Sequence, residues 1–227
     1  MDIDLLMLDD TPDAAAVAYF GGLPPIPAGL AFDWPHCSHC EGPLQYLGRV
    51  PHPVDSSKRL LIFQCANDPG MCDEWEPEAG GNKVLVVAAA ADAQFAQPPS
   101  KGESIFHRAW RAIRRYGQPP SAYVTTLETA WSGHSEICAA DSYGDAVAKF
   151  DQPDDQRRQV LGQLGGRPDW IQEDETPVCP ACGQPMVLAA QLEEGPDPET
   201  AMNFGGGWAY VFTCPCPADE ARFLSQC

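Results

Sequence analysis

Short apolar runs bounded by turn residues recur along this chain, and they predict β-strands. Each run is four to seven residues long, is rich in branched and aromatic side chains, and is flanked by glycine, proline or polar residues. That pattern is typical of strands rather than helices. Tyr123–Leu127 has weaker strand character, and Asp145–Phe150 is too short to assign. The strands expected are Leu44–Val50, Leu60–Phe63, Lys83–Val87, Met186–Leu192 and Trp208–Phe212.

One segment has the periodicity of a helix. The apolar residues of Ser104–Tyr116 share one face, and Ser100 and Glu103 have the spacing of a capping box. Gly117 and a following proline end the pattern. The opposite side carries a cluster of basic residues, a pattern most typical of a solvated helix face. These residues are Arg108, Arg111, Arg114 and Arg115.

The two ends of the chain carry related sequences in the same order. A Gly-Gly-x-Pro turn is followed by a Pro-x-Cys-x-x-Cys-x-x-Pro motif and then by an apolar run that ends in cysteine. Chance would supply one such match but hardly three in the same order. The matching pairs are Gly21–Pro24 with Gly165–Pro168, Pro35–Tyr46 with Pro177–Leu188, and Leu60–Cys65 with Ala209–Cys214.

These patterns together predict an α+β fold that is mainly β. It contains two pseudo-repeated antiparallel β units with zinc knuckles and a few short helices. Residues 1–97 form the first β-rich half and residues 159–227 the second. Residues 98–158 form a connecting segment with the helix near 104–116, and the Ala- and Pro-rich residues 89–103 lead out of the first half as a linker.

Eight of the ten cysteines are predicted to be zinc ligands. A Cys-x-x-Cys turn places two thiolates on one face of a tetrahedral ion, and a second pair follows the next strand in each half. A site of four thiolates has no open position for a substrate, so we expect about two zinc ions with a structural role. The predicted sets are Cys37, Cys40, Cys65 and Cys72, and Cys179, Cys182, Cys214 and Cys216.

Several alternatives remain open for these cysteines. His36 or His39 would be able to replace a thiolate in the first set, and Cys227 would be able to replace Cys216, because one residue between Cys214 and Cys216 leaves little room for two ligands. The cysteines would otherwise form disulfides or bind no metal.

Charge and composition narrow the function classes. The formal net charge is -18, and residues 1–100 hold four basic residues against 14 acidic ones. Nucleic-acid and membrane-surface binding both require a basic face, so neither partner is expected. The acidic start of the chain lacks the pattern of a signal peptide, and no run approaches the length of a membrane span. We therefore expect a cytoplasmic protein in which the cysteines stay reduced.

The motifs resemble the YwqG-like family of uncharacterised proteins. The resemblance covers about residues 19–87 and 159–227, and its most specific part is Leu164–Gln172, which reads LGGRPDWIQ. It implies a duplicated, mostly β fold and no particular activity. A more distant similarity, in the order knuckle, strand, cysteine, is to the programmed-cell-death-protein-two group of ribosomal-protein chaperones. The chain departs from that group by lacking a clear central zinc-finger insertion.

Three functions are compatible with these patterns. The first is a non-enzymatic module that binds or chaperones a basic protein or peptide in a groove that Trp34, Trp170, Gln172 and Trp208 would line. Simple core packing is the alternative role for these tryptophans. The second is a hydrolase that uses either Cys138 with His134 or His107 with a nearby acidic residue, although no recognised catalytic motif is present. The third is a zinc or redox sensor centred on Cys214 and Cys216.

Overall fold

The computed structural model describes residues 2–90, 92–99, 125–127, 129–150, 159–196 and 202–227. The helix expected near 104–116, with its arginine cluster and His107, lies outside these residues, as does Tyr123 at the start of the weak strand pattern. Within them the fold is mainly β, as the sequence predicts, and the short helix α2 (Tyr143–Ala148) begins after Ser142, whose side chain caps the backbone N–H of Asp145.

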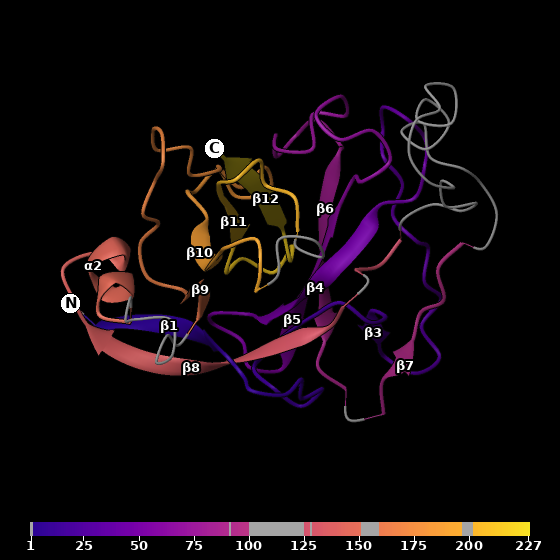
Figure 1. Ribbon diagram of the computed structural model, residues 1–227. Helices are drawn as coiled ribbons and strands as arrows, with labels where there is room; N and C mark the ends of the chain where they lie inside the picture. The colour runs from indigo at the N-terminus through magenta and orange to yellow at the C-terminus, as the bar shows by residue number, and fades with distance from the viewer. Residues whose placement is uncertain (1, 91, 100–124, 128, 151–158, 197–201) are drawn as a thin grey trace, which may run out of the picture.

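The described part of the chain forms a ten-stranded sheet in which every pairing between neighbouring strands is antiparallel (Figure 1). The strand order across this sheet is β12-β11-β10-β9-β1-β8-β2-β4-β5-β6, and two further short strands, β3 and β7, pair with each other. The bounds are β1 Asp2–Leu8, β2 Ala18–Phe20, β3 Pro25–Ile26, β4 Gln45–Pro51, β5 Lys58–Gln64, β6 Asn82–Ala88, β7 Gln94–Phe95, β8 Trp131–Ala139, β9 Val160–Leu164, β10 Val187–Leu192, β11 Trp208–Thr213 and β12 Ala221–Gln226.

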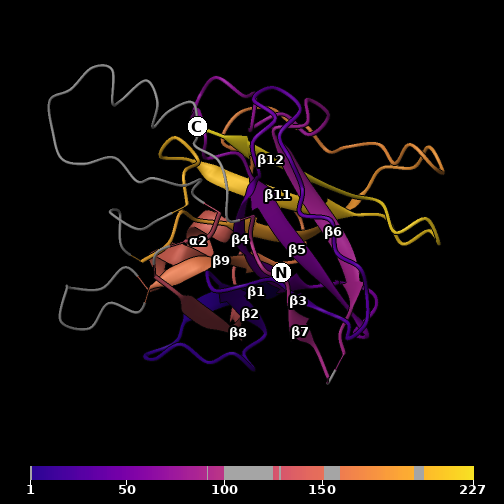
Figure 2. The same ribbon diagram turned by 90° about the vertical axis from the view of Figure 1, so that its right-hand side faces the viewer.

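The sheet curls until its two ends nearly meet. Figure 1 and Figure 2, which differ by a turn of 90°, show the end of the sheet with β11 and β12 facing the end with β5 and β6, and β12 contacts β6 although the two strands come from opposite halves of the chain. The seam between β6 and β12 is bridged by the loop that follows β5. Two contacts join this loop to β12. The Ser225 N–H donates to the Trp75 carbonyl at 3.2 Å, and Arg222 forms an ion pair with Glu78 at 2.6 Å.

Alternating side chains divide the core into an inner and several outer clusters. Leu60 and Ile62 of β5 pack inside the curl, whereas Leu61 and Phe63 pack on its outer face. The same alternation holds in β11, where Val211 points inward and the side chains on either side of it point outward. Strands buried on both faces read as continuous apolar runs, which is why both were recognisable in the sequence.

Strands β1 and β8 lie in the middle of the sheet and were not expected from the sequence. The central strand β1 pairs with β8 on one side and with β9 on the other. The segment expected to connect the two halves contributes β8, which lies between β1 and β2. The segment expected to be a linker contributes β7, which pairs with β3.

Among the described residues, none of the helices is long and apolar enough to span a membrane.

Candidate metal centres

The eight cysteines expected to bind metal converge in two groups of four. In each group the four Sγ atoms lie within 4.8 Å of one another. The separations between individual sulfurs that the structure defines are 3.7 Å for Cys40–Cys65, 3.8 Å for Cys179–Cys216 and 3.4 Å for Cys182–Cys214. A tetrahedral ion with metal–sulfur bonds of about 2.3 Å requires sulfurs about 3.8 Å apart, whereas a disulfide requires about 2.05 Å. The spacing therefore fits two metal ions, and all ten cysteines are free thiols.

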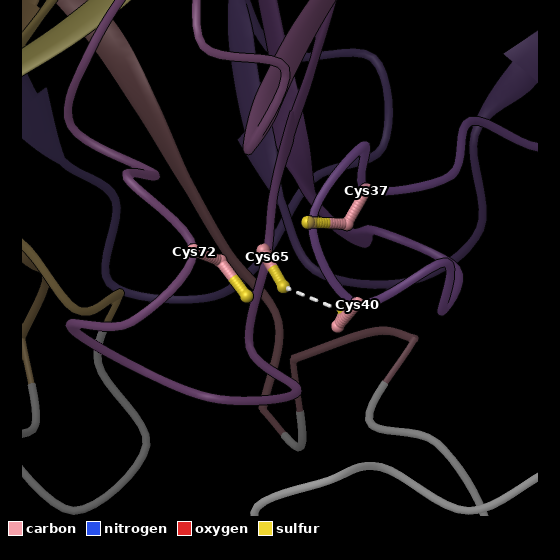
Figure 3. Close-up of side chains that lie close together, drawn as sticks. All are labelled: Cys37, Cys40, Cys65 and Cys72. Carbon is pink, nitrogen blue, oxygen red and sulfur yellow. Dashed lines mark hydrogen bonds between the residues drawn. The ribbon is translucent and has the colours of Figure 1, made fainter.

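Three separate segments build the first group. Figure 3 shows Cys37 and Cys40 on one turn, Cys65 just after β5, and Cys72 on the loop that follows, with their side chains directed toward a common centre. The Cys65 N–H donates to the Gly81 carbonyl at 2.8 Å, which fixes the end of β5 against the start of β6. A metal ion here would tie the turn before β4 to the loop after β5.

The Cys-x-x-Cys turns have the same backbone hydrogen bonds in both groups. The Cys37 N–H donates to the Gly42 carbonyl at 2.8 Å, and the Cys179 N–H donates to the Gln184 carbonyl at 2.8 Å. The residue after the second cysteine of each turn has a positive φ, 60° at Glu41 and 71° at Gly183. Such a backbone turns the chain sharply enough for both thiols to face the same point.

Hydrogen bonds to sulfur are present in the first group. The His39 N–H donates to Cys37 Sγ at 3.4 Å, and the fully buried Asn67 side chain donates to Cys40 Sγ at 3.5 Å and Cys65 Sγ at 3.6 Å. N–H donors of this kind stabilise thiolates and orient them toward a cation. This role of Asn67 was not recognisable in the sequence, because the residue lies beyond the motifs, which end at Cys65.

The thiols of the first group cannot all ionise without a cation. The Cys65 thiol donates to Cys37 and lowers the pKa of Cys37 to about 4. The same hydrogen bond, together with burial, raises the pKa of Cys65, and burial raises that of Cys72 to about 12. A bound metal must displace the protons of Cys65 and Cys72, so metal affinity decreases as the pH falls.

The alternative ligands lie outside the two groups. His36 is exposed, and the His39 ring contacts the Ala79 carbonyl at 3.1 Å instead of the four sulfurs. Cys227 is exposed near Gly205. Only one residue separates Cys214 from Cys216, yet both fit in the second group. Cys216 lies in a turn beyond the end of β11 and approaches Cys179, whereas Cys214 approaches Cys182.

The expected groove residues are not in one place. Trp34 is 7% exposed, donates its indole N–H to the Leu44 carbonyl at 2.8 Å and packs with the first cysteine group. Trp170 and Trp208 are half-buried and pack against the second group instead. The Gln172 amide is exposed and donates to the Cys227 carbonyl at 2.7 Å.

The expected catalytic pair is separated along one strand. Cys138 and His134 are four residues apart in β8, so their Cα atoms are about 13 Å apart at the usual rise of a strand. Cys138 is buried in the apolar cluster that also contains Ile3, whereas His134 is exposed and contacts the Asp9 carboxylate at 2.6 Å. This arrangement does not allow the imidazole to take a proton from the thiol.

Comparisons with known proteins add little about function. No family model matches this chain. The uncharacterized protein YpfL of Salmonella typhimurium (strain LT2) is 42% identical to the chain over 67 residues. This match covers 30% of the chain and 15% of that protein, so the chain corresponds to only a small part of this relative.

Gly81 gives a test of how closely the first group depends on its supporting backbone. A Cβ atom at Gly81 would lie 2.2 Å from the Cys72 carbonyl oxygen and 2.8 Å from Glu74 Cα, and both are backbone atoms. We expect Gly81→Ala to displace Cys72, to lower the free energy of unfolding by about 2–3 kcal/mol, and to speed metal loss to a chelator. Gly144→Ala is the control, since its nearest neighbour would be 3.6 Å away. Equal metal retention in both variants would contradict the expectation.

Proposed function

We propose that this chain is a zinc-stabilised, non-catalytic binding protein that recognises a basic segment of another protein. The observation that carries the first part is the convergence of four thiols, twice, at tetrahedral spacing. Four thiolates in a closed tetrahedral arrangement are typical of structural zinc, although they also suit iron. Metal analysis of the purified protein distinguishes these ions, and about two zinc ions per chain are expected.

The place of each cysteine group supports a structural role. The first group belongs to the apolar cluster on the outer face of β5, and the second to the corresponding cluster on the outer face of β11. Each ion would hold a turn and a loop over strand residues that would otherwise be exposed to water. Metal binding thus contributes to folding and leaves no ligand position for a substrate.

We further propose that the chain arose by duplication of a β unit. The hydrogen bond from Gly21 N–H to the Leu47 carbonyl has its counterpart in that from Gly165 N–H to the Ala189 carbonyl, at 2.8 and 2.9 Å. The strand pairing of β4 with β5 is interrupted between Tyr46 and Gly48, and that of β10 with β11 between Leu188 and Ala190. Each of these features recurs 142 to 144 residues later along the chain. They also support membership of the YwqG-like family as a proposal.

The binding part of the proposal depends on charge. A net charge of -18 creates a negative potential that attracts basic segments and increases their rate of association. The distant similarity to chaperones of a basic ribosomal protein points in the same direction. Neither argument requires a catalytic group.

Peptide titration tests this binding. We expect a fluorescent 12-residue peptide rich in arginine and lysine to bind saturably to the metal-loaded chain, with affinity about tenfold lower at 300 mM than at 50 mM salt because of screening. A glutamate-rich peptide of the same length is the control. If the basic peptide does not saturate at either salt concentration, or if the acidic peptide binds as well, the binding proposal is wrong.

A metal or redox sensor is the second candidate, and one observation favours it. Cys182 is exposed and Cys216 half-buried, whereas three of the four cysteines in the first group are buried. Exposed zinc thiolates are the more accessible to oxidants. Mild peroxide tests this candidate. If it releases one equivalent of metal and oxidises only the second cysteine group, the sensor role is favoured over the binding role.

A further inference from the structure

A cavity lies at the seam where the two ends of the sheet approach each other. Its volume is about 530 Å³. One wall is the loop after β5, including Gly70, Glu74 and Trp75, and the other contains residues 203–205 and 225–227. The cavity is therefore formed by segments that are more than 100 residues apart in sequence.

The charge of this cavity differs from that of two other hollows in the described part of the chain. Its lining contains one acidic residue, Glu74, and no lysine, arginine or histidine residue. Two other hollows of similar size are lined in part by basic residues, Lys83 and Arg222 in one and Arg49 and Arg59 in the other. In an acidic chain, a cavity without its own cation favours a cationic ligand.

Glu74 has hydrogen-bonding capacity that the described residues do not use. The residue is only 5% exposed. Its Oε1 atom accepts a hydrogen bond from the Gly70 N–H at 2.6 Å, but Oε2 is buried without a donor among these residues. A buried acceptor without a donor is costly, and more so in a carboxylate. Glu74 is not needed as a metal ligand, because four thiols already complete the neighbouring group.

Aromatic residues line the same cavity as Glu74. Trp75 lines the cavity and is 39% exposed, so part of its ring is open to solvent. Phe204 lines the opposite wall. A carboxylate beside an aromatic ring suits a guanidinium group better than an ammonium group, because guanidinium is planar, donates two parallel hydrogen bonds and stacks on rings.

We propose that this cavity binds the guanidinium group of an arginine side chain, with Glu74 as its counter-ion and Trp75 as its stacking surface. This inference rests on the proposed function, because a basic segment of another protein would supply the arginine. It adds to that function the chemical group recognised and the place where it binds.

Titration with N-acetyl-L-arginine amide tests the proposal. We expect saturable binding to the metal-loaded chain with a dissociation constant on the order of 1 mM, detected by calorimetry and by tryptophan fluorescence. Glu74→Gln keeps an oxygen for the Gly70 N–H but removes the charge, and we expect affinity to fall about tenfold or more. Glu76→Gln is the matched control, because this exposed residue of the same loop does not line the cavity.

A second variant covers the case in which Glu74→Gln does not fold or loses metal. Trp75→Ala removes a half-exposed ring while keeping the carbonyl that bonds Ser225, and we expect it to weaken binding about fivefold. The proposal fails if the arginine amide does not saturate, if the Glu74 and Glu76 variants bind it equally, or if N-acetyl-L-lysine amide binds as tightly.

Peptides distinguish this proposal from the proposed function. A basic peptide whose arginines are replaced by neutral citrulline should bind about tenfold more weakly to the wild-type chain, and this loss should be clearly smaller in the Glu74→Gln variant, where only the long-range attraction is lost. If basic peptides bind equally to wild type and Glu74→Gln, the cavity proposal is wrong but the binding function stands. If the arginine amide binds through Glu74 but no basic peptide binds, the cavity proposal stands and the binding function is wrong.

Discussion

Replacing Cys37 with serine is expected to lower the metal content from about two ions to about one and to destabilise the fold by about 4 kcal/mol or more. The buried Cys37 Sγ belongs to a group that joins three segments, and serine is a poor ligand for zinc. Without the ion, the turn before β4 and the loop after β5 lose the link that holds them over the outer face of β5. Metal analysis and denaturant unfolding measure the two effects.

Two serine variants outside the metal groups serve as controls for this prediction. Cys138 is a buried thiol in β8, and Cys227 is an exposed thiol near Gly205. Neither Cys138→Ser nor Cys227→Ser should change the metal content. A loss of metal in Cys227→Ser would show that this residue, rather than Cys216, is the fourth ligand of the second group. Unchanged metal content in Cys37→Ser would remove the basis of the proposed architecture.

Replacing Leu6 with alanine is expected to cost about 3 kcal/mol in the free energy of unfolding. Leu6 belongs to the central strand β1, is 0% exposed and packs in the inner core. Its side chain lies over Gly133 of β8, so the cavity left by truncation cannot close without moving the middle of the sheet. Denaturant unfolding with constant metal loading measures the loss.

Val54→Ala is the control for the Leu6 substitution. Val54 is 61% exposed in the turn before β5, and its truncation should change stability by less than about 0.5 kcal/mol. An equally small effect at Leu6 would mean that β1 is not part of the core. That outcome would contradict the observed sheet, in which β1 joins the strands on either side of it.

The metal groups and the cavity have different consequences for function. The ions would stabilise loops, whereas the cavity would recognise a ligand, and the loop after β5 belongs to both. Cys72 and Glu74 are two residues apart on that loop, so an ion at the first group would also fix the wall of the cavity. Ligand binding measured before and after metal removal would therefore report on the link between them.

The sequence alone determined the mainly β fold, five of its strands and both cysteine sets. Local information was sufficient because β5 and β11 are buried on both faces and read as unbroken apolar runs, and because each Cys-x-x-Cys turn depends on a few adjacent residues. The second cysteine pair of each set was also predictable. In an antiparallel pair, the end of the second strand lies beside the start of the first strand, so the cysteine after β5 returns to the turn before β4.

Only the tertiary structure decided the role of β1 and β8, the curl of the sheet and the cavity at its seam. The start of the chain was weighed only as a possible signal peptide, although Leu5–Leu8 is an apolar run of four residues. The central place of β1 depends on pairing with β8 and β9 more than 100 residues away. The separation of Trp34 from Trp170 and Trp208 likewise depends on which outer cluster each side chain enters. Glu74 could not be recognised in the sequence, because its burial, with no donor to Oε2 among the described residues, is a property of the folded loop.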